Sequence, residues 1–207
     1  MPQSDPAVPA HGGELSHAPV PAPASVAAPA AAEAPASGAA VRHGLLCLGL
    51  AAFWAASAWT AAHVRAAPPL HTAALLVHLV SLVAGFGAVL AVDYVGTLWL
   101  LGRRTLCQVL DLAAPLHVPI WGGLAGLTLS GVLLEPHLDS GLTQLKLVLV
   151  LLIALNGVQA GALQRRLERY GEQRPPRPLL LRGGLSALVS QLGWWGALLI
   201  GFYNAQR

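Results

Sequence analysis

Charged residues are scarce in this sequence. Only 10% of its 207 residues are Asp, Glu, Lys or Arg, whereas 55% are hydrophobic. A soluble domain carries about 25% charged residues, because its surface must face water. A chain with so little charge must place its apolar surface against another solvent, and lipid is the solvent that fits. The composition therefore predicts an integral membrane protein.

Cysteine is almost absent too, and the usual catalytic signatures are missing. Cys47 and Cys107 lie far apart, without a CxxC pair or a Cys/His cluster, so neither a disulfide framework nor a zinc site is indicated. The sequence pI is near 9.3, but the arginines lie between hydrophobic stretches rather than on one basic patch, so nucleic acid is not an expected partner. No Walker A, HExxH, GxSxG or dinucleotide-binding motif occurs, and enzymatic activity stays an open question.

Residues 1–40 are rich in alanine and proline and contain almost no large apolar or aromatic side chains. Such a segment cannot bury enough surface to offset the entropy lost on ordering, so we expect a disordered tail. It lacks the short basic start of a signal peptide, and cleavage is therefore not expected.

Residues 41–207 contain five apolar stretches, each long enough to cross about 30 Å of hydrocarbon as a helix. Leu, Ala, Val and Gly dominate them, without the alternation of apolar and polar residues that is typical of a membrane β-barrel. The sequence therefore predicts an all-α, polytopic transmembrane bundle. Its predicted spans are Gly44–Ala62, Leu70–Leu101, Leu112–Leu134, Leu142–Leu163 and Leu185–Tyr203.

The distribution of arginine predicts the orientation in the membrane. One side of the predicted bundle has only Arg65 and Arg207, with Lys146 inside or at the edge of the fourth span. Basic residues collect on the cytoplasmic side of membrane proteins, so we expect a cytoplasmic N-terminus, a bacterial inner membrane, and attraction of anionic lipids to the segment 165–182. The other nine arginines lie on the opposite side, which is therefore predicted to be cytoplasmic: Arg42, Arg103, Arg104, Arg165, Arg166, Arg169, Arg174, Arg177 and Arg182.

Two GxxxG patterns, Gly122 to Gly126 and Gly157 to Gly161, lie within predicted spans. Small residues at this spacing let two helix backbones approach closely. They serve either packing within one bundle or a dimer face, and we favour packing within the chain because five helices have many internal contacts to make.

Ionisable side chains within a membrane span are costly, so each needs a partner or a purpose. His78 and Asp93 in the second span are 15 positions apart. At about 100° per residue, their side chains are separated by about 60° around the helix axis and therefore lie on similar faces. His78 and Lys146 of the fourth span lie at a similar depth near the outer side. Asp93 and His117 of the third span lie towards the cytoplasmic side, where Asn156 can complete an inner polar network.

Each of these residues has a functional and a structural interpretation. His78 suits an axial ligand of haem iron, or else a hydrogen bond between helices. Lys146 suits a counter-ion for a haem propionate or an anionic substrate, or else extends its ammonium to the outer interface. Asp93 needs a partner, for which His117 is the first choice, in either a proton relay or a structural pair.

The region from His78 to Asn156 resembles small four-helix bacterial membrane families, the copper-resistance D-type proteins and the HemJ-type protoporphyrinogen oxidases. The resemblance is carried by LLVHLVSLVAGFGAVLAVDYVGTLWLLGRR, a histidine helix that ends in an arginine pair, and by SGLTQLKLVLVLLIALNG, a helix that opens with lysine. It covers under half of the chain, and the first span and Asp93 depart from that pattern. The resemblance implies haem b as cofactor, His78 as its ligand and Lys146 as a second functional residue.

Three hypotheses of function follow. The first is a haem b-binding redox protein. The second is a small proton-coupled transporter or ion-conducting protein, with Asp93 and His117 on a polar pathway. The third is a non-catalytic assembly or scaffold protein whose polar groups only hold helices together. A visible absorption spectrum distinguishes the first hypothesis from the other two.

Overall fold

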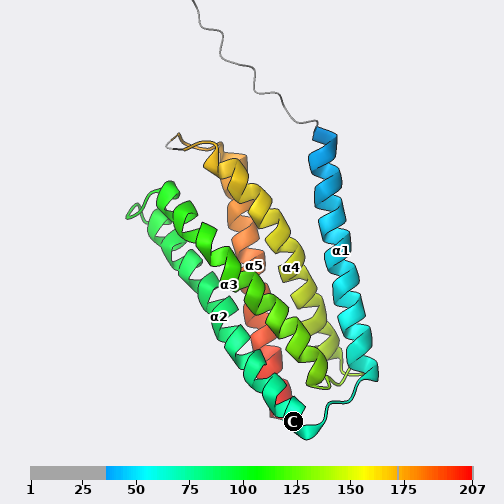
Figure 1. The fold of residues 1–207 in the computed structure, drawn as a ribbon. Coiled ribbons are helices and arrows are strands. Elements are labelled where there is room, and N and C mark those ends of the chain that lie inside the picture. Colours follow the sequence, from blue (N-terminus) through cyan, green and yellow to red (C-terminus); the bar gives the residue numbers. More distant parts are fainter. Residues whose placement is uncertain (1–35, 172, 207) are drawn as a thin grey trace, which may run out of the picture. The chain divides into compact units, whose positions relative to one another are not determined.

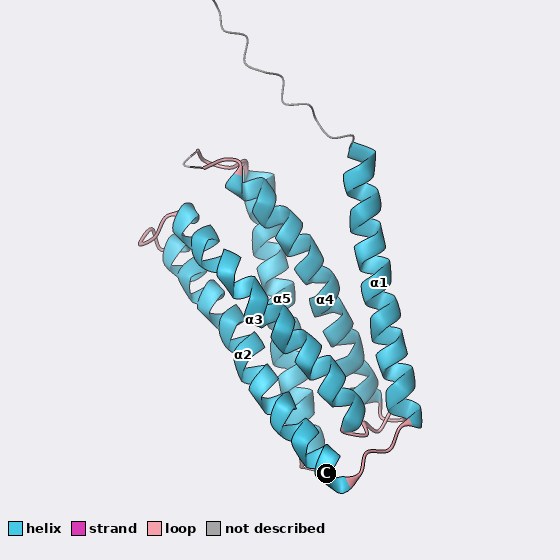
Figure 2. Cartoon of the chain, viewed as in Figure 1, coloured by secondary structure: helices cyan, strands magenta, loops and turns pink. Residues whose placement is uncertain are grey.

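Five long α-helices make up the protein in a computed structural model that describes residues 36–171 and 173–206 (Figure 1). All five are long and apolar enough to cross a membrane, and short loops join them, with no strand in the described ranges (Figure 2). The predicted all-α, multi-pass architecture is therefore confirmed. The helices are α1 (Ala36–His63), α2 (Pro68–Leu100), α3 (Leu106–Leu133), α4 (Gly141–Glu168) and α5 (Arg177–Ala205).

Several helices extend beyond the apolar stretches that predicted them. Helix α3 begins at Leu106, earlier than predicted, because Thr105 and Gln108 form a capping box in which each side chain bonds the other's backbone N–H. Helix α4 continues to Glu168, and α5 begins at Arg177, well before its apolar stretch. Hydropathy marks the part of a helix that fits into lipid, whereas the helix itself continues until capping or proline ends it.

The boundary predicted for the N-terminal tail was too late. Helix α1 begins at Ala36, so the last five residues of the predicted tail form its first turn and more. Proline does not occur between positions 36 and 67, and alanine has the highest helix propensity of all residues. The remainder of that prediction concerns residues 1–35, which lie outside the described residues.

The helices form two hairpins within one compact unit. Helices α2 and α3 pack closely along their length, as do α4 and α5, while α1 packs more loosely against α3 and α4 (Figure 1). The start of α1, the α2–α3 loop and the α4–α5 loop lie at one end of the bundle (Figure 1). We call this the arginine-rich end, because eight arginines lie in the two loops or in the helix turns beside them, and Arg42 lies near the start of α1.

Glycine lets α2 and α3 touch backbone to backbone. A Cβ atom added to Gly123 would lie 2.5 Å from the Cα of Gly85 and 2.6 Å from the carbonyl oxygen of Ser81. Gly126 also faces Ser81, whereas an added Cβ on Gly122 would meet nothing within 4 Å. The expected close packing therefore uses Gly123 with Gly126, and not the Gly122 of the GxxxG pattern, because the helix turns Gly122 away from α2.

This contact predicts opposite outcomes for two adjacent substitutions. Gly123→Ala should destabilise the fold by about 1–3 kcal/mol, because the new methyl group meets backbone atoms that cannot move aside. Gly122→Ala, the matched control, should be neutral or slightly stabilising, since it adds helix propensity in open space. Denaturant unfolding of both variants in detergent micelles measures the difference, and equal stabilities would contradict the packing described for α2 and α3.

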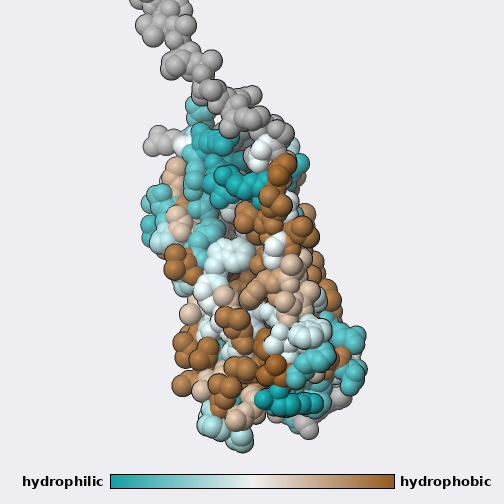
Figure 3. Space-filling view, turned by 45° about the vertical axis from the view of Figure 1, so that its right-hand side comes forward, coloured by the Kyte–Doolittle hydropathy of each residue, from teal (hydrophilic) through white to brown (hydrophobic). Residues whose placement is uncertain are grey.

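Apolar side chains point outward around the helices as well as inward. Val83 and Leu181 are each 74% exposed, and Val118 is 77% exposed. Figure 3 shows apolar surface over much of the middle of one face, with hydrophilic residues gathered towards the ends. Lipid tails are the environment that such a surface requires. The chain is thus a multi-pass membrane protein whose polar interior groups have to be explained individually.

Candidate functional site between the two hairpins

The side chains of interest lie where the α2–α3 hairpin meets the α4–α5 hairpin. Few backbones approach closely across this interface, so large side chains and polar pairs fill it. Phe86 of α2 and Trp194 of α5 stack at its centre, with ring centroids 5.6 Å apart. Leu124, Ile153 and other buried residues surround them. Polar groups lie on either side of this apolar centre.

The His78 ring is held in a fixed orientation. Its Nδ1 lies 2.9 Å from the hydroxyl oxygen of Ser130 on α3, and that hydroxyl donates its own proton to the carbonyl oxygen of Gly126. Ser130 therefore accepts a hydrogen bond from Nδ1–H, which assigns the proton of the neutral ring to Nδ1. In this tautomer Nε2 carries the lone pair, the arrangement found for metal-binding histidines, and the ring also lies within hydrogen-bonding range of the Leu127 backbone.

Lys146 of α4 lies in the same part of the interface. It is close enough to His78 to interact with it electrostatically, and its Nζ is 3.5 Å from the position of a Cβ added to Gly201 on α5. The side chain is half-buried. Within residues 36–171 and 173–206 it has no hydrogen-bond or ion-pair partner. Lys146 is thus within electrostatic range of His78, and no described residue acts as its counter-ion.

Trp194 is a second polar group without a partner. It is only 2% exposed, and its indole Nε1 is the buried side-chain nitrogen in the described part that makes no hydrogen bond. Its ring reaches the backbone of α2 at Gly85, midway between His78 and Asp93. A buried unpaired donor is costly. Trp194 therefore places an unpaired donor at the centre of the interface, between the His78 and Asp93 ends.

Asp93 is paired, but not with the predicted partner. Its carboxylate accepts a short hydrogen bond from the side-chain amide of Gln191 on α5. His117 instead directs its Nδ1 to the carbonyl oxygen of Ala113 in its own helix, 2.9 Å away. The predicted pairing of Asp93 with His117 was therefore wrong, because α2 presents Asp93 to the fifth helix and α3 presents His117 towards α4.

The predicted inner network also loses its third member. Asn156 of α4 donates its amide to the carbonyl oxygen of Ser186 on α5 and accepts from the Ser186 hydroxyl, both at 2.9 Å. This reciprocal pair joins the two helices of one hairpin. Asp93, His117 and Asn156 therefore make three separate contacts and no common polar pathway among the described residues.

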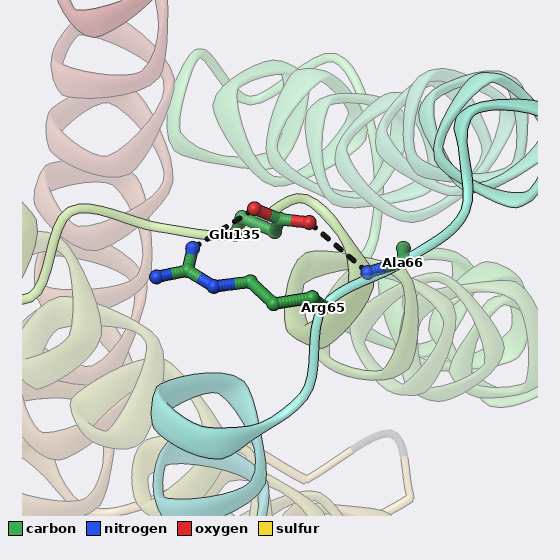
Figure 4. Close-up of polar contacts among 3 residues, drawn as sticks. All are labelled: Arg65, Ala66 and Glu135. Carbon is green, nitrogen blue, oxygen red and sulfur yellow. Dashed lines mark hydrogen bonds and ion pairs between the residues drawn. The ribbon is translucent and has the colours of Figure 1, made fainter.

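One ion pair ties the connecting segments together at the end opposite the arginine-rich end. Arg65, between α1 and α2, donates to the carboxylate of Glu135 at 2.9 Å, and the backbone N–H of Ala66 donates to its other oxygen at 3.0 Å (Figure 4). The bond from Arg65, and then that from Ala66, lower the pKa of Glu135. These contacts hold Glu135 at a φ of 47°, a region that residues other than glycine rarely adopt. The pair weakens as the pH falls through that lowered pKa.

Comparison with known proteins gives no further constraint. No family model, curated protein or solved structure matches the chain. The resemblance of residues 78–156 to haem- and copper-related membrane families therefore stays a prediction. The geometry of the hairpin interface is what bears on function.

Proposed function

We propose that this protein binds haem b, which His78 would hold through the iron and Lys146 through a propionate. The observation that carries the proposal is a His78 ring oriented by Ser130 through Nδ1, within electrostatic range of an ammonium group that has no counter-ion among the described residues. A neutral imidazole ligates haem iron, and a propionate neutralises a lysine at the same depth. Ser130 has the role of a positioning residue, because it fixes the ring and its tautomer.

A single histidine ligand suits haem iron better than it suits a bare metal ion. A structural or catalytic metal ion takes several protein ligands, and residues 36–171 and 173–206 contain no group of three His, Cys, Asp or Glu side chains placed to hold one. A porphyrin supplies four nitrogen ligands of the iron itself, so the protein needs to supply only one or two more. When bound, haem would give the chain one-electron redox chemistry.

The experiment that tests the proposal is the absorption spectrum of the full chain, purified in detergent from cells supplied with a haem precursor. We expect a Soret band and reduced-state bands, at close to one haem per chain by pyridine haemochrome assay. Protein that stays colourless after such expression, and also after haem is added to the purified chain, would contradict the proposal and favour transport or scaffolding.

We further propose that the membrane is the bacterial inner membrane and that the arginine-rich end faces the cytoplasm. The support is the count of nine arginines towards one end of the predicted bundle against two towards the other, since positive charge is retained on the cytoplasmic side. Lys146 and His78 then lie towards the outer side.

Reporter fusions test this orientation. Fluorescent-protein fusions that end after Arg104 or Arg174 should be bright, because this reporter matures only in the cytoplasm, and a fusion after Asp139 should be dark. Alkaline phosphatase fusions at the same three positions should give the reverse pattern and serve as the control. Inversion at two of these positions would overturn the proposed orientation.

A further inference from the structure

A groove lies between α1, α3 and α4. Its cavity volume is about 680 Å³, within the range of roughly 300–1,000 Å³ that ligand pockets usually have. Leu46, Leu50 and Phe53 of α1 form one wall, and Trp121 lies opposite. The groove exists because α1 packs only loosely against its neighbours, whereas the two helices within each hairpin pack tightly.

The apolar part of the groove continues towards the middle of the bundle. A smaller cavity of about 70 Å³ shares Leu50, Phe53 and Trp121 with the larger one, and adds apolar residues such as Val150. The Trp121 ring also packs over Gly157, at 3.1 Å from an added Cβ. A hydrocarbon chain running along α1 would meet apolar side chains over the whole of this distance.

The opposite part of the groove is polar and lies at the arginine-rich end. Arg165 Nη1 and His117 Nε2 approach the same point, 3.8 and 3.9 Å from a Cβ added to Gly161. The nearby carboxylate of Glu168 accepts a hydrogen bond from Gln164 at 2.9 Å. Arg165 has no hydrogen-bond or ion-pair partner in the described part of the chain. The groove therefore offers a guanidinium that has no ion-pair partner among the described residues, although the Glu168 carboxylate also lines the groove.

We propose that this groove binds one anionic phospholipid, with its phosphate at Arg165 and an acyl chain along α1 between Leu50 and Trp121. The charge selects the head group, because an arginine guanidinium is suited to phosphate and pairs with it through parallel hydrogen bonds. The apolar residues that extend the groove favour a molecule with a hydrocarbon chain over a free anion. The neutral His117 ring donates its Nδ1–H to the Ala113 carbonyl, so its Nε2 is an acceptor and the phosphate depends on Arg165 for its hydrogen bonds. This site is separate from the hairpin interface and does not depend on haem binding.

Native mass spectrometry of the full chain, released from nanodiscs of equal phosphatidylglycerol and phosphatidylcholine content, tests the proposal. We expect one phosphatidylglycerol to be retained in preference to phosphatidylcholine. Arg165→Gln should reduce that preference about five- to tenfold. Arg166→Gln is the matched control, since Arg166 is an exposed neighbour that does not line the groove, and it should leave the preference nearly unchanged.

A second pair of variants tests the groove without altering any charge. Gly49 lines it, and an added Cβ there meets nothing within 4 Å, so Gly49→Leu should fill the space and remove the retained lipid. Gly44→Leu makes the same change in open space on the same helix, outside the groove, and should have no effect. Equal losses in Arg165→Gln and Arg166→Gln, retention in Gly49→Leu, or no preference in the wild type would each overturn the proposal.

Discussion

Replacement of His78 by alanine should abolish the Soret band of the purified protein. The substitution removes the only nitrogen that the proposal assigns to the iron, and apolar contacts alone hold haem weakly in a detergent-exposed bundle. The fold should survive, because Ser130 keeps its hydrogen bond to the Gly126 carbonyl when the imidazole is lost. Absorbance at equal protein concentration, with circular dichroism to confirm helix content, measures the effect.

His71→Ala is the matched control for this variant. His71 lies on the same helix, seven residues before His78 and on a similar face, and it is not assigned to the site. We expect its spectrum to equal that of the wild type. An unchanged spectrum in His78→Ala, together with a coloured wild type, would eliminate His78 as the ligand and direct attention to another histidine.

Replacement of Lys146 by methionine should change stability and haem retention in opposite directions. Without haem, the variant should be more stable than the wild type by about 1–2 kcal/mol. That is less than the roughly 3 kcal/mol assigned to a lysine at the bilayer centre, because Lys146 is half-buried and lies nearer a helix end. With haem, loss of the pairing with a propionate should speed dissociation about 10- to 100-fold. Thermal unfolding of the haem-free protein and haem transfer to apomyoglobin measure the two effects.

These opposite signs separate a functional lysine from one that only reaches the interface. A lysine whose ammonium extends into water has little desolvation to recover and no ligand to lose, so both quantities would stay unchanged. Gln159→Met, a polar-to-apolar change at an exposed position of the same helix, is the control and should leave haem retention unaltered. Equal haem retention in Lys146→Met and the wild type would remove Lys146 from the site.

The sequence was sufficient to predict the helices because hydrophobicity and length decide which segments enter a membrane. It was insufficient for their ends, since α3 begins at the capping box of Thr105, which lies outside the apolar stretch. It also assigned Gly122 to a helix contact that Gly123 makes. Which face of a helix meets which neighbour depends on how the whole bundle packs, and apolar residues all round each helix leave no periodic signal for it.

The candidate site was predictable to the same degree. The shared depth of His78 and Lys146 could be read from their positions in two spans, and Lys146 lies within electrostatic range of His78. The partners were not predictable: Ser130, Gln191 and Trp194 are unremarkable polar or aromatic residues until packing aims them at the interface. Of the three, only Gln191 could have been singled out from the sequence, because a polar side chain deep within the fifth span indicates a hydrogen bond to another helix.

Chemical rescue tests the central claim most directly. His78→Gly removes the imidazole and leaves a space beside Ser130, into which free imidazole can enter. We predict that His78→Gly purified in detergent and supplied with haem lacks the wild-type spectrum, that added imidazole restores it in a saturable manner, and that toluene does not. A His78→Gly spectrum already identical to the wild type, or one that imidazole leaves unchanged, would contradict ligation of haem by His78.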